Sequence, residues 1–252
     1  MQDIDYYYLP ETDSTNMRMW SMIDSGRIRK EGSIVRAGMQ YSGKGMGNTS
    51  WQSERGKNLL FSVLLKPDFI SPAGQFLLNK CIATSVREAL ASLCPEAVFT
   101  IKWPNDIYSG NGKISGTLIE NRIMGRTLEL SVVGIGINVN QEKFHPDIPN
   151  PVSLKLLCGR DTSIDHCLKT VILQLKNNYR LLKNDPENRS DAIEDNYLKH
   201  LLGYGHTKRF RRDGRILTGT ICGVDKYGKL LLKDTDGKVN SFGTKEIEFI
   251  AD

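Results

Sequence analysis

The sequence predicts an α+β fold in which a mixed β-sheet domain with packed helices precedes a small all-β domain. In the first 150 residues, strand-like runs outnumber helix-like segments and often follow one another directly, which favours an α+β layer over a doubly wound α/β sheet. From Gly203 onward, short alternating runs are separated by turn signals at Asp225 to Gly228 and Asp234 to Gly237, as in a small β-barrel. We therefore expect two domains, residues 1–202 and 203–252.

The expected elements follow hydrophobic periodicity and turn signals. A cap at Ser14 or Asp13 predicts a helix to about Ile23, and apolar residues at three-to-four spacing predict two longer helices and a shorter one after a polar stretch at 184–189. The longer helices are expected at 76–93 and 163–183. Strands are expected at 33–37, 59–66, 98–102, 114–121, 128–139, 215–224, 229–233 and 238–242.

Composition restricts the class of protein. The chain has 252 residues, 39% of them apolar, and a formal net charge of +5, which is ordinary globular composition and excludes fibrous, collagen-like and disordered classes. Residues 203–252 carry ten Lys+Arg against seven Asp+Glu, too small an excess to indicate nucleic-acid binding. No apolar stretch approaches the roughly 20 residues that span a bilayer. The start, MQDIDYYYLPETDS, lacks the basic and apolar regions of a signal peptide, so we expect a cytoplasmic protein without a membrane partner.

Cysteine and histidine usage points to packing rather than to cross-links or metals. The five cysteines are odd in number and never form a C-x-x-C pair, which argues against a disulfide framework or a structural zinc site. We expect them to be reduced, and the four scattered histidines offer no transition-metal constellation. The cysteines are Cys81, Cys94, Cys158, Cys167 and Cys222.

A glycine-rich segment from Gly38 to Trp51 directly follows the first expected strand, at 33–37. It matches G-x-x-x-x-G-K up to Lys44, but Gly45 replaces the magnesium-binding Ser/Thr of a P-loop and no helix pattern follows, so we reject that interpretation. The segment is either a turn that presents backbone N–H groups to an anion, with Lys44 adding charge, or a mobile hairpin loop. The residues alone leave both open.

Two further clusters lie at expected strand ends. Lys102-Trp-Pro-Asn105-Asp106 ends one strand, and its Asn-Asp pair is either an Asx-type turn or a set of binding groups on a strand-end loop. Lys113 begins the next apolar strand, in which Gly116 either weakens the strand or lets a ligand approach the backbone closely.

A fourth cluster, GIGINVN at 134–140, begins like a dinucleotide fingerprint but lacks the third glycine and the following helix, which argues against Rossmann binding. Asn138 should be buried where its strand ends. A buried amide needs hydrogen-bond partners, so Asn138 either ties a turn or reads the edge of a heterocycle.

Together with DSTN at 13–16, these clusters resemble the biotin protein ligases in both order and spacing. The resemblance covers nearly the whole chain, through Gln40 with the glycine-rich segment, KWPND at 102–106, KISGTL at 113–118 and GIGINVN. It implies a class II synthetase-like catalytic domain with an SH3-like C-terminal barrel. Because DSTN begins at residue 13, we expect the monofunctional type, without the helix-turn-helix that some members use to bind DNA.

The activity implied by the resemblance is that of a biotin--[acetyl-CoA-carboxylase] ligase. Such an enzyme uses ATP and Mg²⁺ to convert its substrate biotin into biotinyl-5′-AMP, then transfers the biotinyl group to a lysine of a biotin carboxyl carrier protein domain. A monomer or weak homodimer is expected. Two alternatives stay open: a lipoate or octanoate ligase, whose acyl chain has no ureido ring, and a non-catalytic ligand-binding regulatory module. Four polar residues favour biotin over these acyl chains: Ser14, Thr15, Asn16 and Gln40. Lys44 and Lys113 in the expected site argue against the non-catalytic module.

The resemblance also implies residue roles. Lys113, bridging the biotin carboxylate and the α-phosphate, is the main catalytic candidate, and Lys44 is the second. The biotin-binding set is Ser14, Thr15, Asn16, Gln40, Gly43, Gly45, Lys113 and Gly116. The ATP and adenylate set is Lys44, Met46, Trp51, Lys102, Asn105, Asp106 and Asn138. Asp106 is also a candidate for indirect Mg²⁺ binding or for orienting a lysine.

The glycine-rich segment departs from the family pattern. Biotin ligases usually place arginines after its first basic residue, whereas here Met46, Gly47, Asn48 and Thr49 follow, and Lys44 is the only charge in the segment. Lysine holds phosphate as a point charge and arginine as a bidentate fork, so retention of the adenylate is expected to differ. Arg55 is a candidate to compensate. We expect the segment to become ordered when ligand binds.

A basic cluster lies early in the expected barrel, just before the turn signal Asp213-Gly214. It is too short to favour a nucleic-acid patch, and we expect a solvated rim or a contact for an acidic carrier domain. The cluster consists of Lys208, Arg209, Arg211 and Arg212.

Overall fold

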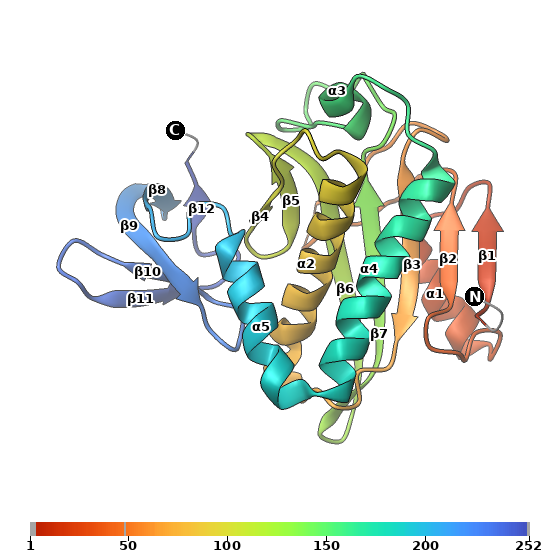
Figure 1. Ribbon diagram of the computed structural model, residues 1–252, viewed down its shortest axis with the longest axis horizontal. Coiled ribbons are helices and arrows are strands. Elements are labelled where there is room, and N and C mark those ends of the chain that lie inside the picture. Colours follow the sequence, from red (N-terminus) through yellow and green to blue (C-terminus); the bar gives the residue numbers. More distant parts are fainter. Residues whose placement is uncertain (1–3, 48, 251–252) are drawn as a thin grey trace.

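The computed structural model describes residues 4–47 and 49–250, which form two β-sheets and a set of helices (Figure 1). The larger sheet has seven strands in the order β1-β2-β3-β7-β6-β5-β4. Only β1 and β2 pair in parallel, so the sheet is mixed. Its strands are β1 (Tyr6–Leu9), β2 (Ile34–Ala37), β3 (Leu59–Leu65), β4 (Thr100–Lys102), β5 (Asp106–Ser109), β6 (Gly112–Met124) and β7 (Thr127–Ile137).

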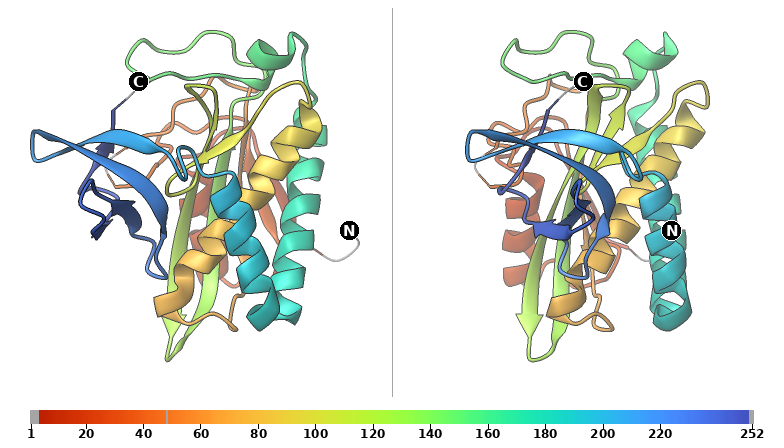
Figure 2. Two further views of the ribbon diagram at one scale, coloured as in Figure 1. Left: turned by 60° about the vertical axis from the view of Figure 1, so that its left-hand side comes forward. Right: turned by 90° about the vertical axis from the view of Figure 1, so that its left-hand side faces the viewer.

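Helices cover both faces of this sheet. Three long helices, α2 (Gln75–Leu93), α4 (Ile164–Asn184) and α5 (Pro186–Lys199), lie on one face, and α1 (Thr15–Asp24) lies on the other (Figure 2). Because β3 lies between α1 and the α2 and α4 layer, all seven of its residues are buried. A continuous apolar run is what a strand covered on both faces requires. Two short helices, η1 (Pro72–Gly74) and α3 (Leu154–Cys158), complete this part.

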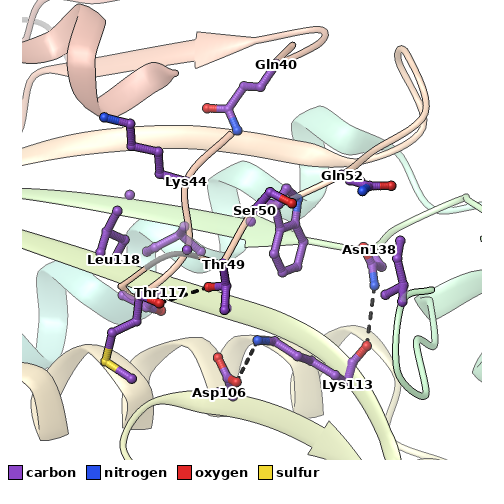
Figure 3. Close-up of a pocket in the computed structure, with 18 of the residues that line it drawn as sticks. Gln40, Lys44, Thr49, Ser50, Gln52, Asp106, Lys113, Thr117, Leu118 and Asn138 are labelled. Carbon is purple, nitrogen blue, oxygen red and sulfur yellow. Dashed lines mark hydrogen bonds and ion pairs between the residues drawn. The ribbon is translucent and has the colours of Figure 1, made fainter. Parts of the chain in front are cut away.

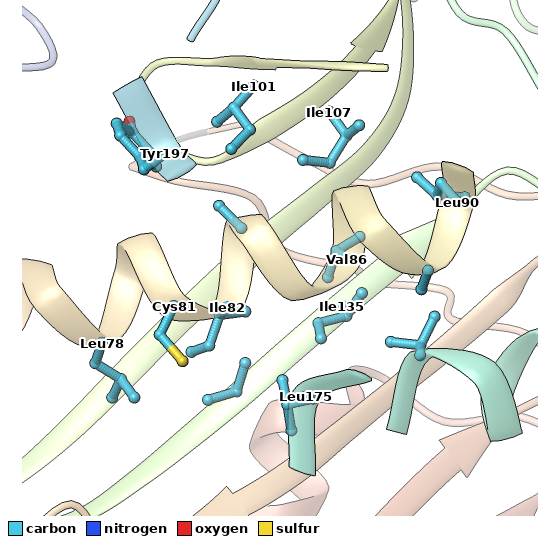
Figure 4. Packing of buried hydrophobic residues seen from close by; sticks show 14 of the residues in the cluster. Leu78, Cys81, Ile82, Val86, Leu90, Ile101, Ile107, Ile135, Leu175 and Tyr197 are labelled. Atoms are coloured by element: carbon cyan, nitrogen blue, oxygen red, sulfur yellow. The ribbon is translucent and has the colours of Figure 1, made fainter. Parts of the chain in front are cut away.

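The main core fills the space between the sheet and the long helices (Figure 4). Leu78, Ile82 and Val86 project from one side of α2, because residues three and four apart share a helix face. They are each at most 1% exposed and belong to one cluster with Ile135 of β7 and Leu175 of α4. This core fixes the positions of the strand ends, and those strand ends form the candidate site.

The smaller sheet is antiparallel, in the order β11-β10-β9-β8-β12. It is attached to the larger domain by the indole of Trp103, which donates a hydrogen bond from Nε1 to the Gly228 oxygen at 2.9 Å. Phe210 and Leu230 belong to the same hydrophobic cluster as the larger sheet. Its strands are β8 (Thr207–Arg212), β9 (Arg215–Val224), β10 (Leu230–Lys233), β11 (Val239–Phe242) and β12 (Glu248–Phe249).

The α+β fold class is confirmed, and each expected helix and strand is present with boundary shifts at its ends. Helix α5 begins at Pro186, inside the stretch expected to be a polar linker. Sequence reasoning missed six short elements, which are β1, η1, β5, α3, β8 and β12. Within the described residues, no helix has the length and apolar character needed to cross a membrane.

The expectation that all five cysteines are reduced is wrong for one pair. Cys94 and Cys158 form a disulfide between the ends of α2 and α3, with Cα atoms 6.2 Å apart and 64 residues of sequence separation. Only the tertiary fold brings these residues together, so their spacing gave no signal. Their sulfurs also lie within 4.8 Å of a carboxylate oxygen of Glu96, but sulfurs joined in a disulfide offer no thiolate to a metal ion. Cys81 and Cys167 are free and buried, as expected.

Candidate functional site

A cavity of about 370 Å³ opens beside the start of α1, over the ends of β6 and β7 (Figure 3). The glycine-rich segment forms one wall, and the turns before β5 and after β7 form the others. Thirteen of the residues singled out in the sequence line it: Ser14, Thr15, Asn16, Gln40, Lys44, Gly45, Met46, Trp51, Asn105, Asp106, Lys113, Gly116 and Asn138. The fold therefore brings together motifs more than 100 residues apart.

Polar side chains form a network at the amino-terminal end of α1. Ser62 Oγ lies 2.6 Å from Asn16 Oδ1 and 2.8 Å from Thr15 Oγ1. Since the Asn16 oxygen can only accept, Ser62 donates to Asn16 and accepts from Thr15. Asn16 Nδ2 in turn donates to Glu120 Oε2 at 2.9 Å. These bonds hold the side chains of Thr15 and Asn16 in one orientation at the edge of the cavity.

Gln40 completes this network from the start of the glycine-rich segment. Its Oε1 accepts the backbone N–H of Thr15 at 2.7 Å, which satisfies one of the unpaired donors at the start of α1. Ser14 is the N-cap residue, yet its side chain makes no capping hydrogen bond. It is 3% exposed and lines the cavity, so its hydroxyl is available to a ligand.

Paired glycines form the floor of the cavity, and the indole of Trp51 lies on them. Gly116 of β6 pairs with Gly136 of β7. A Cβ atom at Gly136 would lie 2.6 Å from Trp51 Cε2, and one at Gly116 would lie 3.1 Å from Trp51 Cζ3. Any larger residue would displace the ring. Within the described residues, Trp51 Nε1 is buried without a hydrogen-bond partner, which is a donor that a ligand could satisfy.

Lys113 and Asp106 lie side by side on one wall of the cavity, on adjacent strands, and Figure 3 marks the ion pair between them. Lys113 Nζ lies 2.6 Å from Asp106 Oδ2, and the two side chains are 31% and 28% exposed. The lysine also lies 5.9 Å from the centroid of the Trp51 ring. An ammonium ion held by one carboxylate, but still open to the cavity, can exchange that partner for an anionic substrate.

The backbone at Lys113 is fixed by the segment after β7. Its N–H donates to the Asn150 oxygen at 2.7 Å, and its carbonyl accepts from the Val152 N–H at 3.0 Å. Asn138 Nδ2 donates to the Val152 oxygen at 3.0 Å, so Asn138 ties this turn. Asn105 likewise donates from Nδ2 to the Thr117 oxygen at 3.2 Å. Both amide nitrogens are thus engaged by backbone, which leaves the amide oxygens to any heterocycle.

Two of the expected site residues do not line the cavity. Lys102 Nζ lies 3.4 Å from the Tyr108 hydroxyl and 5.6 Å from the ring centroid of Phe249, toward the smaller sheet. Burial lowers the pKa of Lys102, Asp106 opposes this shift and Lys113 adds to it. Gly43 is a buried residue of the glycine-rich segment, and its carbonyl accepts the Trp51 N–H at 2.9 Å.

The glycine-rich segment is a short hairpin. Lys44 and Ser50 form a bridge, and the Gly45 N–H donates to the Thr49 oxygen at 2.8 Å. Asn48 lies outside the described residues. Lys44 extends to the side of the cavity opposite Lys113 (Figure 3). Arg55, the candidate to compensate for the missing arginines, forms an ion pair with Glu11 at the surface and is absent from the described cavity lining.

Sequence reasoning missed several contributors to the site. Ser62 is a fully buried hydroxyl inside the apolar run LLFSVLL, and a polar residue in such a run was the available signal. Glu120 lies on β6, and no pattern in the surrounding sequence marked it as a site residue. The segment after β7 contributes Phe144, Asp147 and Ile148 to the cavity, and nothing in its composition separated it from an ordinary loop.

Comparisons with known proteins show which family the chain resembles. Residues 8–138 match the model of the biotin/lipoate A/B protein ligase family. The Escherichia coli bifunctional ligase/repressor BirA is 32% identical over 245 residues, 95% of this chain and 72% of that protein. The Bacillus spizizenii bifunctional ligase/repressor BirA is 29% identical over 82% of this chain, which spans 63% of that relative's length. A solved structure of biotin protein ligase from Aquifex aeolicus with biotin and ATP superposes with a TM-score of 0.79 at 26% identity, covering 98% of this chain and 99% of that one.

Proposed function

Because this chain belongs to the biotin/lipoate A/B protein ligase family, we propose that it activates biotin with ATP as biotinyl-5′-AMP and transfers the biotinyl group to a carrier lysine. One observation supports this most strongly. A single cavity joins a network of neutral hydrogen-bonding groups at one end to an ion-paired lysine beside a glycine floor at the other. The related Aquifex ligase was solved with biotin and ATP together, which supports the same pair of substrates here.

The neutral end suits the ureido ring of biotin. That ring is uncharged and offers N–H donors and a carbonyl acceptor, which hydroxyls and amides match without the desolvation cost of a charge. Ser14, Thr15, Asn16 and Gln40 supply such groups in fixed orientations. A lipoate or octanoate chain would leave them unpaired, and unpaired buried polar groups oppose binding.

The charged end suits the joining of two anions. When the biotin carboxylate oxygen attacks the α-phosphorus of ATP, a phosphorus–oxygen bond forms and pyrophosphate leaves. Negative charge grows on the phosphate oxygens during this step, and a preorganised cation stabilises it. We assign this role to Lys113, whose ammonium group Asp106 would hold until substrate competes for it. Neither this step nor attack by a carrier lysine needs a covalent enzyme intermediate.

We assign the nucleotide to the part of the cavity lined by Trp51, Asn105 and Asn138, with Lys44, Gly45 and Met46 covering it. The donor set also suits Mg²⁺ that arrives with ATP: Asp106 and Asp147 are the carboxylates among the described lining residues, and Mg²⁺ commonly pairs one or two carboxylates with substrate phosphates. Since Asp106 already pairs with Lys113, its contact with the metal would run through water.

A pyrophosphate-release assay tests the proposal. The protein is mixed with ATP, Mg²⁺ and either biotin, lipoate or octanoate. Release that depends on biotin supports the assignment, and release that depends on lipoate or octanoate supports the alternative ligase. No release with any acid would favour a ligand-binding regulatory module. A second step, transfer to a purified biotin carboxyl carrier protein domain, tests the proposed partner.

We place the domain boundary at residues 202 and 203, between α5 and the smaller sheet. Arg211 and Arg212 of the basic cluster lie on β8 and pair with Glu248 and Asp213, at 3.8 and 3.5 Å, which suits a solvated strand better than a dedicated carrier surface.

A cytoplasmic location, the absence of DNA binding and a monomer or weak homodimer stay predictions. The Cys94–Cys158 disulfide is unusual for a reducing compartment.

A further inference from the structure

A carboxylate outside the cavity ends the hydrogen-bond network at the start of α1. Glu120 of β6 is half-buried and is absent from the described cavity lining. Its Oε2 accepts from Asn16 Nδ2 at 2.9 Å and from Trp20 Nε1 at 3.3 Å. Within the described residues, no side-chain nitrogen of a lysine, arginine or histidine lies within 4.0 Å of this carboxylate. A partly buried carboxylate whose partners are neutral costs folding free energy, and positions of this kind are common at functional sites.

Two acceptors determine the orientation of the Asn16 amide. Besides the Glu120 carboxylate, the Leu118 oxygen accepts from Asn16 Nδ2, at 3.3 Å. Because a carboxylate and a backbone carbonyl only accept hydrogen bonds, the amide group that faces β6 must be the nitrogen. Both N–H groups of that nitrogen are then satisfied by protein. The amide oxygen, Oδ1, lies against the backbone of Gly134, where any Cβ atom would clash with it.

The orientation of Asn16 fixes the two hydroxyl groups next to it. Since Asn16 Oδ1 only accepts, Ser62 uses its single hydroxyl proton to donate to it, at 2.6 Å. Ser62 Oγ must then accept from Thr15 Oγ1, at 2.8 Å. The chain of donors runs from Thr15 through Ser62 and Asn16 to Glu120. Thr15 and Asn16 both line the cavity, and with their protons committed to this chain their oxygens offer a ligand only lone pairs.

The other polar groups at this end of the cavity can donate. Gln40 Oε1 is occupied by the Thr15 N–H, at 2.7 Å, so Gln40 has its Nε2 donors to offer a ligand. Ser14 makes no capping hydrogen bond, and its hydroxyl can donate or accept. This end of the cavity therefore has an acceptor side, formed by Thr15 and Asn16, and a donor side, formed by Gln40 and Ser14. A cyclic urea has the complementary pattern, because two N–H groups flank its carbonyl oxygen.

We propose that Glu120 is a positioning residue that determines which ligands the biotin end of the cavity accepts. Because its carboxylate cannot donate, every hydrogen bond of the chain runs toward it, and Thr15 and Asn16 meet the ligand as acceptors. The site then selects a heterocycle with N–H groups at this edge. A ring with an oxygen at the same place is rejected, because its lone pairs would face those of the protein. The proposal rests on the ligase function above and adds the origin of its selectivity.

The first test is the kinetics of biotin-dependent pyrophosphate release. Glu120→Met removes the acceptor and keeps the length of the side chain, so we expect KM for biotin to rise about tenfold, with kcat and KM for ATP within about twofold of the wild type. The conservative Glu120→Gln keeps an acceptor oxygen and should hold KM for biotin within about threefold. The matched control is Glu129→Met, a half-buried glutamate at the opposite end of β7 from the cavity, for which all three constants should be unchanged.

A second test separates this role from a general weakening of the site. Calorimetry compares biotin with two analogues, in each of which oxygen replaces one ureido N–H. The wild type should bind at least one analogue about tenfold more weakly than biotin, because an acceptor of the site then faces lone pairs. In Glu120→Met the Leu118 oxygen alone holds the Asn16 amide, through the 3.3 Å bond, so the amide can turn and the ratio should fall to within about threefold.

Three results would overturn the proposal. They are a KM for biotin in Glu120→Met equal to that of the wild type, equal losses of affinity for biotin and for both analogues in that variant, and a wild type that binds both analogues as tightly as biotin. If the wild type neither binds biotin nor releases pyrophosphate with it, the ligase function itself fails. That result is distinct from an active wild type whose Glu120→Met variant is unaltered.

Discussion

Lys113 Nζ and Asp106 Oδ2 are 2.6 Å apart, at the start of β6 and of β5, and both side chains remain about one-third accessible to solvent. A surface pair of this kind contributes little to folding stability. Its position in the cavity gives it another role. The aspartate keeps the flexible ammonium group beside the glycine floor before substrate arrives, so less side-chain entropy is lost when the transition state forms.

Replacing Lys113→Ala should lower the rate of adenylate formation by about 100-fold or more, the usual effect of removing one preorganised group from a developing anion. Asp106→Asn should have a smaller effect, since it removes the partner and leaves the cation. Biotin-dependent pyrophosphate release measures both. Lys176→Ala, at an exposed position of α4, is the control. A Lys113→Ala variant that keeps the wild-type rate would contradict the assignment.

The two substitutions should also be non-additive. If Asp106 acts by positioning Lys113, then Asp106→Asn should change the rate much less in the Lys113→Ala background than in the wild type. Equal effects in both backgrounds would show that Asp106 acts independently.

Replacing Ser62→Ala should weaken biotin binding. The change leaves Asn16 Oδ1 without its donor and frees the Thr15 hydroxyl, and an unsatisfied buried group costs about 1–3 kcal/mol. Calorimetry with biotin is the measurement. Ser131→Ala is a matched control, because Ser131 is an equally buried serine of the same sheet that donates to Asn121. Ser131→Ala should reduce stability without reducing biotin affinity, and equal affinity losses in both variants would indicate a general effect on the sheet.

Adding a methyl group with Gly136→Ala should displace the Trp51 indole from the glycine floor. A Cβ atom there would lie 2.6 Å from the ring, closer than unbonded carbon atoms approach. We expect an altered Trp51 fluorescence spectrum and weaker ATP binding. Trp51→Phe identifies the part of the signal that belongs to this indole. An unchanged spectrum in Gly136→Ala would mean that the ring does not rest on this floor in solution.

Cysteine alkylation without reductant should modify Cys222 rapidly and leave the other four residues intact. Cys94 and Cys158 are cross-linked, and burial raises the pKa of both the Cys81 and the Cys167 thiols to about 12, so these two stay protonated and inert at neutral pH. Peptide mass spectrometry shows which cysteines are alkylated. Native-state labelling of Cys94 or Cys158 before reduction would show that the pair is not cross-linked.

The same disulfide should stabilise the fold. Removing a cross-link that closes a loop of this length costs about 2–4 kcal/mol, so Cys158→Ser should lower the free energy of unfolding by that amount. Chemical denaturation of the oxidised wild type and of the variant is the measurement. Under reducing conditions the two proteins should differ much less, because the wild type then also lacks the cross-link.

The sequence was informative where a feature repeats or where a function constrains several residues at once. Helix α2 is periodic over 19 residues, and β3 is apolar apart from Ser62, so both were predicted to within one or two residues. The glycine-containing motifs were recognisable as a set. A ligand that approaches the backbone closely requires glycine, and the polar groups that contact it allow few other residue types. The cavity brings most of those residues together, although their roles stay predictions.

The features that were missed depend on tertiary contacts. Strand β5 has only four residues, too few for a periodic signal, so Asp106 was expected on a loop and instead begins a strand. The Cys94–Cys158 pair and the contact between Lys245 and Gly47 each join segments far apart in sequence. No local sequence pattern reveals these pairs, because only the packing of the helices and of the smaller sheet brings their members together.

The hydrogen bond from Trp103 to Gly228 makes the smaller sheet more than an appendage. A truncated chain ending before β8 would leave an indole donor without its acceptor and would uncover apolar side chains that share a core with Phe210 and Leu230. Such a fragment should be prone to aggregation rather than behave as an autonomous module. Recombination that exchanges this sheet between homologues would therefore have to preserve the surface against which it packs.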